Sequence, residues 1–549
     1  MAESITTGSA RLGRHASTMA AGTLVSRVLG VVRTWMLIAA VGVNFGAANA
    51  FDVANRAPNF LFAIIAGGVL NAVLVPQIVK AQRSANGQGY VDRLLTLAGV
   101  LILGITLVMT LGATVVIGLY IDNWSPQLTA LAVAFGFWCI PQLFFYGLYT
   151  LLGQVLNARE HFGPFMWAPV LNNVVSIIGF GAFIAIFGRY STTADPNDLS
   201  SWTGAKIALL AGTATLGVAA QALILLIPLR RDGFHWRPRW GFRGVGLGSA
   251  GKVAVWTFAS LVLDQIGVLL VTRIASGAAR ASGYAIDVAG NAAYTNALMI
   301  YLLPHSLVTV SIATALFTRI SAAAADGDVP AVRGHLSLGM RMIGLFTVFA
   351  TLALAVLALP LTRVVLLTSS FVESVSVARI LVAMLIGLVP LGAMVMMKWV
   401  YFAFEDGRTI FWIQVPMTLI LAGGAWLGSL VLRPAWWVVG IGASMALSNF
   451  VAVLLRLAGL RRRLQGLDGT RILNTHVRAG LAALVAAAIG WGALHALGNI
   501  EALGRLGAFV ACLGIGALML GVYVALLRAL RVRELQDLLD PVMARIRRR

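Results

Sequence analysis

Residues 94–121 read LLTLAGVLILGITLVMTLGATVVIGLYI, a run without a single charged side chain. A helix of about 20 apolar residues is long enough to cross the hydrocarbon core of a bilayer. Comparable runs recur from residue 18 to residue 527, and charged residues make up only 11% of the chain. Soluble domains carry roughly 25% charged residues. The sequence therefore predicts an all-α polytopic membrane protein.

Apolar windows separated by charged or Gly/Pro-rich breaks predict about 14 transmembrane helices. The predicted spans are 18–42, 50–80, 94–121, 128–157, 164–188, 204–229, 250–275, 284–318, 337–367, 376–404, 408–432, 436–460, 474–497 and 503–528. The spans 50–80 and 284–318 are longer than a crossing requires, so we expect them to tilt, kink or project beyond the bilayer. Pro58 and Pro304 are the candidate kink points.

The break after the sixth span alternates basic and aromatic residues and reads RRDGFHWRPRWGFR (230–243). Trp side chains favour the headgroup level of a bilayer, so this segment is predicted to be an interfacial linker between two lobes. The predicted domains are the N-lobe with helices 1–6 (1–229), the linker (230–249), the C-lobe with helices 7–12 (250–460), and helices 13–14 with a basic tail (461–549).

The net charge of +21 comes from short basic tracts that lie between apolar runs. Such tracts are typical of topology signals and lipid-headgroup contacts, so nucleic acid is not an expected partner. The basic tracts fall in the even-numbered connections, whereas residues 43–49 and 122–127 carry no basic side chain. The positive-inside rule then predicts that both termini are cytoplasmic. The Arg461–Arg471 cluster is predicted either to capture anionic lipid substrate or only to fix topology.

Catalytic and metal-binding patterns are missing from the sequence. The two cysteines, Cys139 and Cys512, each lie inside an apolar run without a paired spacing. We found no Ser/His/Asp set, His/Cys cluster or phosphate-binding Gly loop in a plausible context. We therefore expect a protein that is not an enzyme and that has no metal or cofactor.

Charges inside the first two spans are the informative exceptions, because an ionisable group at membrane depth is costly and marks a wet cavity or a partner. A helix separates Arg27 from Arg33 by about 9 Å and roughly 120°, so both could line one broad cavity. Arginine forks suit phosphate oxygens. Asp52 and Arg56 are four residues apart and share one helical face, either as part of the same site or merely as an internal ion pair.

The C-lobe holds two candidate gating or coupling residues. Asp264 lies in the middle of a span and could pair with an N-lobe arginine that the lobes bring close as they rock, or it could face water. Lys398 lies near the cytoplasmic end of its span, where snorkelling to the interface is the alternative explanation.

Four stretches carry a resemblance to a known family: SRVLGVVR (26–33), FDVANRAPNFLFAIIAGGVLNAVLVPQ (51–77), LNAREHFGPFMWAPVLNNV (156–174) and KWVYFAFEDGRT (398–409). In these stretches the chain resembles the MviN/MurJ family of lipid II flippases, within the multidrug/oligosaccharidyl-lipid/polysaccharide exporter superfamily. The resemblance covers essentially the whole chain. It implies two lobes around a cationic cavity, with helices 13 and 14 forming a groove for the lipid tail.

The resemblance also implies roles for individual residues. Arg27 and Arg33 match the first-span arginines that are expected to hold the pyrophosphate of the substrate. The chain departs from the family where Asn49 stands in place of a common acid, and residues 294–306 contain no cavity arginine. Arg56 could supply the missing charge. The predicted substrate-binding residues are therefore Arg27, Arg33, Arg56, Asp52 and Asn49.

The function implied by the resemblance is outward flipping of lipid II, the undecaprenyl-pyrophosphate-linked peptidoglycan precursor, across the bacterial plasma membrane by alternating access. Coupling to membrane potential, to a monovalent ion or to consumption of the product would drive it. The expected partners are that precursor, membrane lipids and cell-wall synthesis proteins. The alternatives are a flippase for another polyprenyl-pyrophosphate oligosaccharide, a cation-coupled small-molecule exporter, which should have an acidic cavity, and a membrane scaffold.

Overall fold

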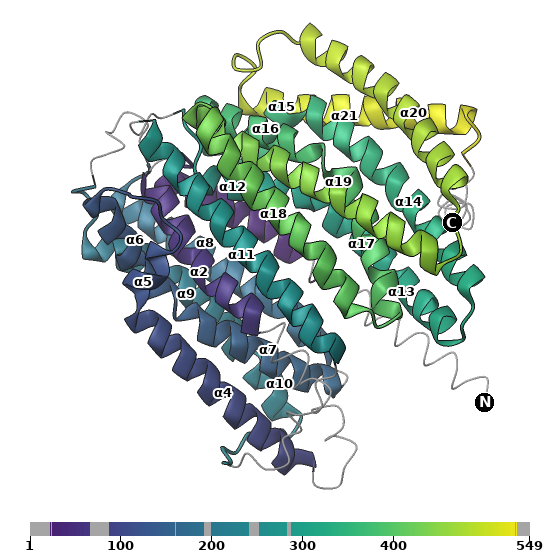
Figure 1. Ribbon diagram of the computed structural model, residues 1–549. Coiled ribbons are helices and arrows are strands. Elements are labelled where there is room, and N and C mark those ends of the chain that lie inside the picture. Colours follow the sequence, from purple (N-terminus) through teal and green to yellow (C-terminus); the bar gives the residue numbers. More distant parts are fainter. Residues whose placement is uncertain are drawn as a thin grey trace. The chain divides into compact units, whose positions relative to one another are not determined.

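The fold is built from membrane-length helices (Figure 1). The computed structural model describes residues 22, 25–44, 46–65, 87–159, 161–190, 199–240, 252–282, 287–532 and 534. In these ranges the regular structure is helical, which confirms the all-α prediction. Among the described residues, 11 helices are long and apolar enough to cross a membrane, or 12 if one bent pair forms a single span. The described ranges therefore do not establish the predicted count of fourteen.

The chain forms two compact units, Met1–Gln265 and Ile266–Arg549. The division falls inside one long helix, α11 (Lys252–Ala281), so the predicted lobe boundaries stay predictions. The other helices of the first unit are residues 25–41, α2 (Gly46–Ile65), α4 (Gly87–Leu111), α5 (Ala113–Gly118), α6 (Pro126–Cys139), α7 (Gln142–Ala158), α8 (Phe162–Phe187), α9 (Gly204–Leu223) and α10 (Leu226–Arg231).

The helices of the first unit pack mainly as pairs, with α8 against α9 and α2 against α6. Local sequence sets where several of them begin. The Ser125 side chain accepts a hydrogen bond from the backbone N–H of Leu128, and Pro126 occupies the first turn of α6. Both features are favoured at a helix N-terminus, where backbone N–H groups lack intrahelical partners.

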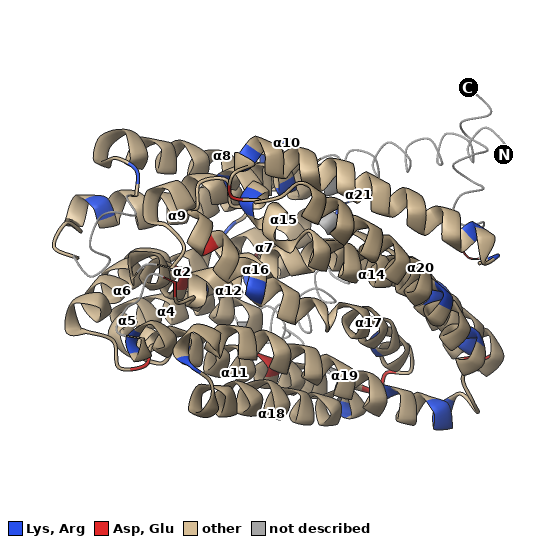
Figure 2. Cartoon of the chain, turned by 90° about the horizontal axis from the view of Figure 1, so that it is seen from above, with Lys and Arg blue, Asp and Glu red and all other residues tan. Residues whose placement is uncertain are grey.

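The second unit contains α12 (Asn291–Pro304), the π-helical turn η3 (His305–Thr309), α13 (Val310–Ala325), α14 (Val329–Val356), α15 (Ala358–Val365), α16 (Phe371–Leu385), α17 (Leu388–Ala403), α18 (Gly407–Val431), η4 (Pro434–Trp436), α19 (Trp437–Arg463), α20 (Gly469–Ala496) and α21 (Gly504–Ala529). Most of each helix is uncharged, and the charged residues are few (Figure 2). This distribution fits helices whose surfaces face lipid.

Irregular helix geometry occurs at one of the two predicted kink points. Pro304 ends α12 and is followed directly by the π-helical turn η3, so the helical register changes there. A proline removes a backbone donor, and a π-turn accommodates the resulting mismatch. Pro58 instead lies inside the uninterrupted helix α2.

A sharper break separates α16 from α17, whose axes differ by 48°. Gly387 lies at this break, and a Cβ there would come within 2.7 Å of the Ala446 Cα. Only glycine allows so close an approach of α19. The Asn449 amide on α19 then donates a hydrogen bond to the carbonyl of Gly387 at 3.2 Å, which satisfies a backbone group that the break exposes.

The last two helices, α20 and α21, pack on α14 and α15. Ala479, Ala482, Ala483 and Ala486 recur at helical spacing along one side of α20 and are at most 1% exposed. Such a stripe of small residues lets two helices approach closely. The spans predicted at 474–497 and 503–528 correspond to α20 and α21, while their lipid groove stays a prediction.

Candidate functional site

The candidate site lies in the first unit, on the helix of residues 25–41 and on the helices around it. Arg27 and Arg33 are both partly exposed, whereas Ile38 and Val41, farther along the same helix, are 2% and 3% exposed. The two arginines therefore occupy the half of this helix that is open to its surroundings. Guanidinium groups placed in this way can reach an anionic ligand.

Arg33 is held next to a phenol on another helix. The Tyr146 side chain on α7 lies close enough to the Arg33 guanidinium to interact with it electrostatically, and its hydroxyl donates to the Gln142 side-chain oxygen at 3.4 Å. A phenol carries no charge at neutral pH. The neighbouring phenol therefore does not cancel the positive charge of Arg33.

One face of α2 carries four polar side chains, namely Asp52, Asn55, Arg56 and Asn59. Residues at spacings of three, four and seven lie on the same side of a helix. We had predicted this for Asp52 and Arg56 only, and we missed Asn55 and Asn59, although the same spacing indicates them.

Gln142 links this polar face to the neighbouring helices. Its amide donates hydrogen bonds to the Asn55 side-chain oxygen at 3.1 Å and to the Thr215 hydroxyl at 3.2 Å. Gln142 is only 1% exposed, and a buried amide without partners would cost stability. The sequence does not predict this connection, because Asn55, Gln142 and Thr215 lie on three different helices, α2, α7 and α9.

Asp52 and Arg56 form an internal ion pair, which is one of the two alternatives predicted for them. Arg56 Nη2 lies 3.2 Å from Asp52 Oδ2, and the two side chains are 15% and 16% exposed. The carboxylate partly neutralises Arg56, so this arginine contributes less free positive charge to a ligand than an arginine beside a neutral group. A role for the pair in substrate binding stays a prediction.

The residue before Arg27 is Ser26, whose backbone is hydrogen-bonded to α8. The Asn173 amide donates to the backbone carbonyl of Ser26 at 2.8 Å and contacts the Ser26 hydroxyl at 3.3 Å. The neighbouring Asn172 donates to Gln221 on α9 at 2.9 Å. The pair of asparagines within the stretch 156–174 thus fixes the backbone beside Arg27 from one side and α9 from the other.

Asn49 lies at the start of α2, close to the turn from the preceding helix. It is 3% exposed, and its amide donates to the backbone carbonyl of Asn44 at 3.3 Å. This contact shapes the turn between the first two helices. Its predicted contact with substrate stays a prediction.

The two predicted gating residues lie apart from this polar network in the sequence. Asp264 is an exposed side chain on α11. Lys398 lies five residues before the end of α17, with its ammonium 5.5 Å from the centre of the Phe402 ring. That position fits a lysine that snorkels toward the interface while contacting an aromatic face. Coupling roles for both residues stay predictions.

Two arginines of the second unit are buried, which the sequence did not predict. Arg456 on α19 is 2% exposed and donates to the Met394 carbonyl at 3.3 Å. Arg341 on α14 is 4% exposed and forms an ion pair with Glu534. Arg456 lies five residues before the first of three consecutive arginines, so the sequence did not distinguish it from the basic end of the helix.

The basic end of α19 divides into two kinds of arginine. Arg463 Nη1 lies 2.7 Å from Asp406 Oδ2, and its guanidinium lies 4.4 Å from the centre of the Phe404 ring. Asp406 also caps α18 by accepting from the Thr409 N–H at 3.0 Å. Arg463 therefore clamps the turn before α18, whereas Arg461 and Arg462 remain exposed for the predicted contact with anionic lipid.

We expect Arg463→Gln to lower the free energy of unfolding by about 1 kcal/mol, because it removes a half-exposed ion pair and a cation–π contact. Thermal unfolding of the purified protein in detergent measures the loss. Arg462→Gln is the matched control and should leave the unfolding temperature unchanged. Equal unfolding temperatures for the two variants would contradict the clamp.

A second clamp lies between the start of α8 and the end of α10. Asp232 Oδ2 accepts from Arg159 at 2.7 Å, and Asp232 Oδ1 lies 3.0 Å from His161 Nε2. The hydrogen bond from Arg159 and then that from His161 lower the pKa of Asp232. A depressed carboxyl pKa means that the folded state binds the proton less readily than the unfolded state does.

The contribution of this clamp should therefore be present above the unfolded pKa of about 3.9 and be lost as the pH falls through the lower folded pKa. Hydrogen exchange of the α7–α8 connection, corrected for the intrinsic rate, should show protection that declines only below about pH 4. Asp232→Asn should give low, pH-independent protection. A decline near pH 6 in the wild type would contradict this assignment.

Comparison with known proteins gives the family. A family model described as lipid II flippase MurJ matches residues 38–501. A protein of Vibrio cholerae serotype O1 named "Probable lipid II flippase MurJ" is 26% identical over 483 residues, which cover 84% of each chain. A Synechocystis protein of the same name is 27% identical over 491 residues, or 87% of each chain.

Solved structures agree in fold. A lipid II flippase MurJ in an inward closed conformation superposes with a TM-score of 0.69 at 18% identity, over 93% of this chain and 99% of that chain. A multidrug resistance MATE family transporter of the MOP superfamily superposes with a TM-score of 0.62 at 17% identity, over 80% and 94%. Because the family model spans most of the sequence, the chain belongs to the lipid II flippase MurJ family.

Proposed function

We propose that this multi-pass membrane protein flips lipid II from the cytoplasmic to the outer leaflet by alternating access. The observation that carries the proposal is the pair of partly exposed arginines, Arg27 and Arg33, on a membrane helix. Neutral groups lie beside this helix, namely the Asn173 amide, which donates to the Ser26 carbonyl, and the Tyr146 phenol, which lies near Arg33. The family match begins at residue 38, so the roles of the two arginines rest on this geometry.

The chemistry of the substrate fits this arrangement. Lipid II presents a pyrophosphate between an apolar tail and a polar headgroup, and arginine forks bind phosphate oxygens in a bidentate manner. The amides of Asn55 and Asn59 on the same unit offer further neutral hydrogen-bonding groups for a glycan or peptide. The relatives named as lipid II flippases support the same substrate class.

We infer the energy source of transport from the negative charge of the substrate headgroup. Outward movement of an anionic headgroup is favoured by an inside-negative potential, by about 2.3 kcal/mol per charge for each 100 mV. A monovalent ion could add to this, with Asp264 or Lys398 as the coupling residue. We propose that both termini are cytoplasmic, that no bound cofactor takes part, and that cell-wall synthesis proteins receive the product.

The decisive experiment uses the purified chain in liposomes that contain a fluorescent lipid II. Accessibility of the label to an external quencher reports on flipping, with an inside-negative or a zero potential. Flipping of lipid II, faster with the potential, supports the proposal. Flipping of only another polyprenyl-pyrophosphate oligosaccharide, or export of a small cation, would replace it with the corresponding alternative. Absence of all three activities would favour the scaffold.

A further inference from the structure

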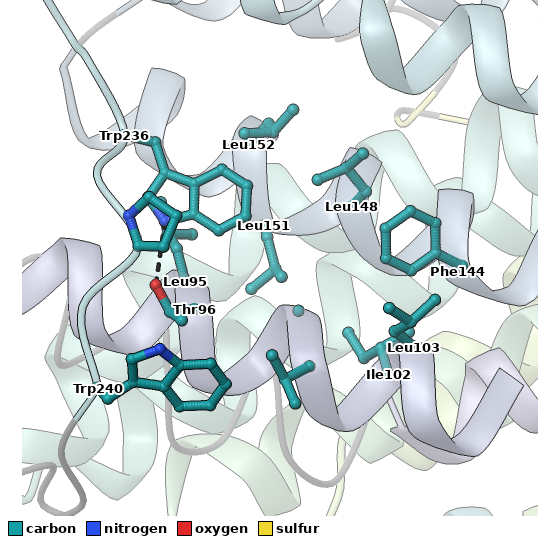
Figure 3. Close-up of a pocket in the computed structure, with 13 residues that line it drawn as sticks. Leu95, Thr96, Ile102, Leu103, Phe144, Leu148, Leu151, Leu152, Trp236 and Trp240 are labelled. Carbon is teal, nitrogen blue, oxygen red and sulfur yellow. Dashed lines mark hydrogen bonds between the residues drawn. The ribbon is translucent and has the colours of Figure 1, made fainter. Parts of the chain in front are cut away.

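The first unit contains an apolar groove that is separate from the arginine site. It lies between α4 and α7, and the linker after α10 closes one end of it (Figure 3). The groove has a volume of about 210 Å³. Leucine, isoleucine, valine and phenylalanine side chains line it, together with Trp236, Pro238 and Trp240.

The polar group in the lining of this groove is already engaged. The Thr96 hydroxyl accepts hydrogen bonds from Trp236 Nε1 at 3.2 Å and from the Arg239 N–H at 3.1 Å, and it donates to the Asp92 carbonyl at 2.6 Å. The first of these bonds is drawn in Figure 3. Because this hydroxyl is already hydrogen-bonded, the interior of the groove suits a hydrocarbon chain better than a polar ligand.

The groove also opens to the outside of the helix bundle. Val100 and Leu103 on α4 are 45% and 43% exposed, and Trp240 is 72% exposed, although all three line it. The lining along α4 runs from Leu95 to Leu103, a length of about 12 Å at the rise of an α-helix. An extended lipid chain with several methylene groups fits such a groove, and tryptophan marks the headgroup end.

Positive charge gathers at that same end. The side chains of Arg93, Arg237 and Arg239 are exposed there. The backbone N–H of Arg237 donates to the Asp92 side chain at 3.3 Å, so the linker is fastened to the first turns of α4. Asp92 is 2% exposed, so the exposed charges described at this end include the three arginines and not this carboxylate. Exposed arginines beside an apolar groove complement an anionic headgroup.

We propose that this groove binds the acyl chain of an anionic phospholipid, whose phosphate contacts Arg237 and Arg239. The lipid belongs to the leaflet at which the linker lies. It is distinct from the flipped substrate, and its binding does not depend on the transport activity proposed above. By filling the space between α4, α7 and the linker, the lipid holds the linker against α4.

The test uses phosphatidylglycerol with a photoreactive group in the middle of one acyl chain. The full-length protein is placed in phosphatidylcholine nanodiscs that contain a small fraction of this probe, and mass spectrometry locates the crosslinks. Crosslinks are expected on the peptides that contain Leu103, Leu148 and Trp236. A phosphatidylcholine probe with the same chain should label these peptides about tenfold less, because two arginines attract the anionic headgroup.

Two sets of variants separate the acyl chain from the headgroup. A Cβ at Gly99 would meet Trp236 at 3.9 Å, an ordinary contact, so the larger side chain of Gly99→Leu should enter the groove and abolish labelling. Gly104→Leu is the matched control on the same helix, since a Cβ there meets nothing within 4 Å. Arg237→Gln with Arg239→Gln should remove the preference for phosphatidylglycerol, whereas Arg461→Gln with Arg462→Gln should keep it.

Three outcomes would overturn the proposal. They are equal labelling by the two probes in the wild type, labelling that Gly99→Leu leaves unchanged in a protein with a wild-type unfolding temperature, and displacement of the probe by polyprenyl phosphate at a lower mole fraction than by unlabelled phosphatidylglycerol. The last result would assign the groove to the tail of the transported substrate.

Discussion

Arg33→Ala should lower the rate of lipid II flipping by about 10- to 100-fold, the loss expected when charge-assisted hydrogen bonds to a phosphate disappear. Arg27→Ala should have a comparable effect. Both proteins should still fold, because each side chain is partly exposed and a truncated side chain at such a position creates no buried cavity. Initial flipping rates in liposomes, together with growth of a strain depleted of its own flippase, measure the effect.

Lysine at either position should restore only part of the activity, because a point charge replaces a bidentate fork. Arg230→Ala is the control, since this exposed arginine at the end of α10 lies outside the polar network of the site. Normal growth and flipping with both Ala variants would remove the two arginines from the mechanism. Tyr146→Phe should reduce flipping less than Arg33→Ala does, because it removes only a neutral hydroxyl near Arg33 and keeps the charge of Arg33.

The second large effect is expected on stability. Glu534→Gln should lower the free energy of unfolding by about 3 to 5 kcal/mol, because it removes one charge of a buried ion pair. The two side chains are 5% and 7% exposed, so water cannot replace the lost partner. Unfolding in detergent with increasing denaturant measures the loss, and protease resistance of α20 and α21 reports where the structure opens.

The double variant Arg341→Met with Glu534→Leu should recover most of the stability, because two apolar groups replace a buried pair without leaving a charge behind. A loss in the double variant as large as in Glu534→Gln would contradict this explanation. Deletion of α20 and α21 should also lower the stability of the protein. It would expose the surface of α14 on which α20 packs, so it should impair folding as well as flipping.

The sequence alone determined the class of fold and the local pairing of Asp52 with Arg56. A bilayer demands that backbone groups be paired within each segment, and long uncharged runs leave the α-helix as the solution. Residues 94–121 were sufficient for that conclusion. Charges placed at helical spacing inside such runs, such as Asp52 and Arg56, could also be recognised, because their contact is local and follows from the helix geometry.

Only the tertiary structure decided which polar groups from distant helices meet. Gln142 and Asn55 are 87 positions apart in sequence, and neither spacing nor composition connects them. The same holds for the buried pair of Arg341 and Glu534, and for Arg463, which looked like its exposed neighbours. Their environments depend on how helices pack side by side, and a bilayer that accepts almost any apolar surface leaves that packing unspecified by hydrophobicity alone.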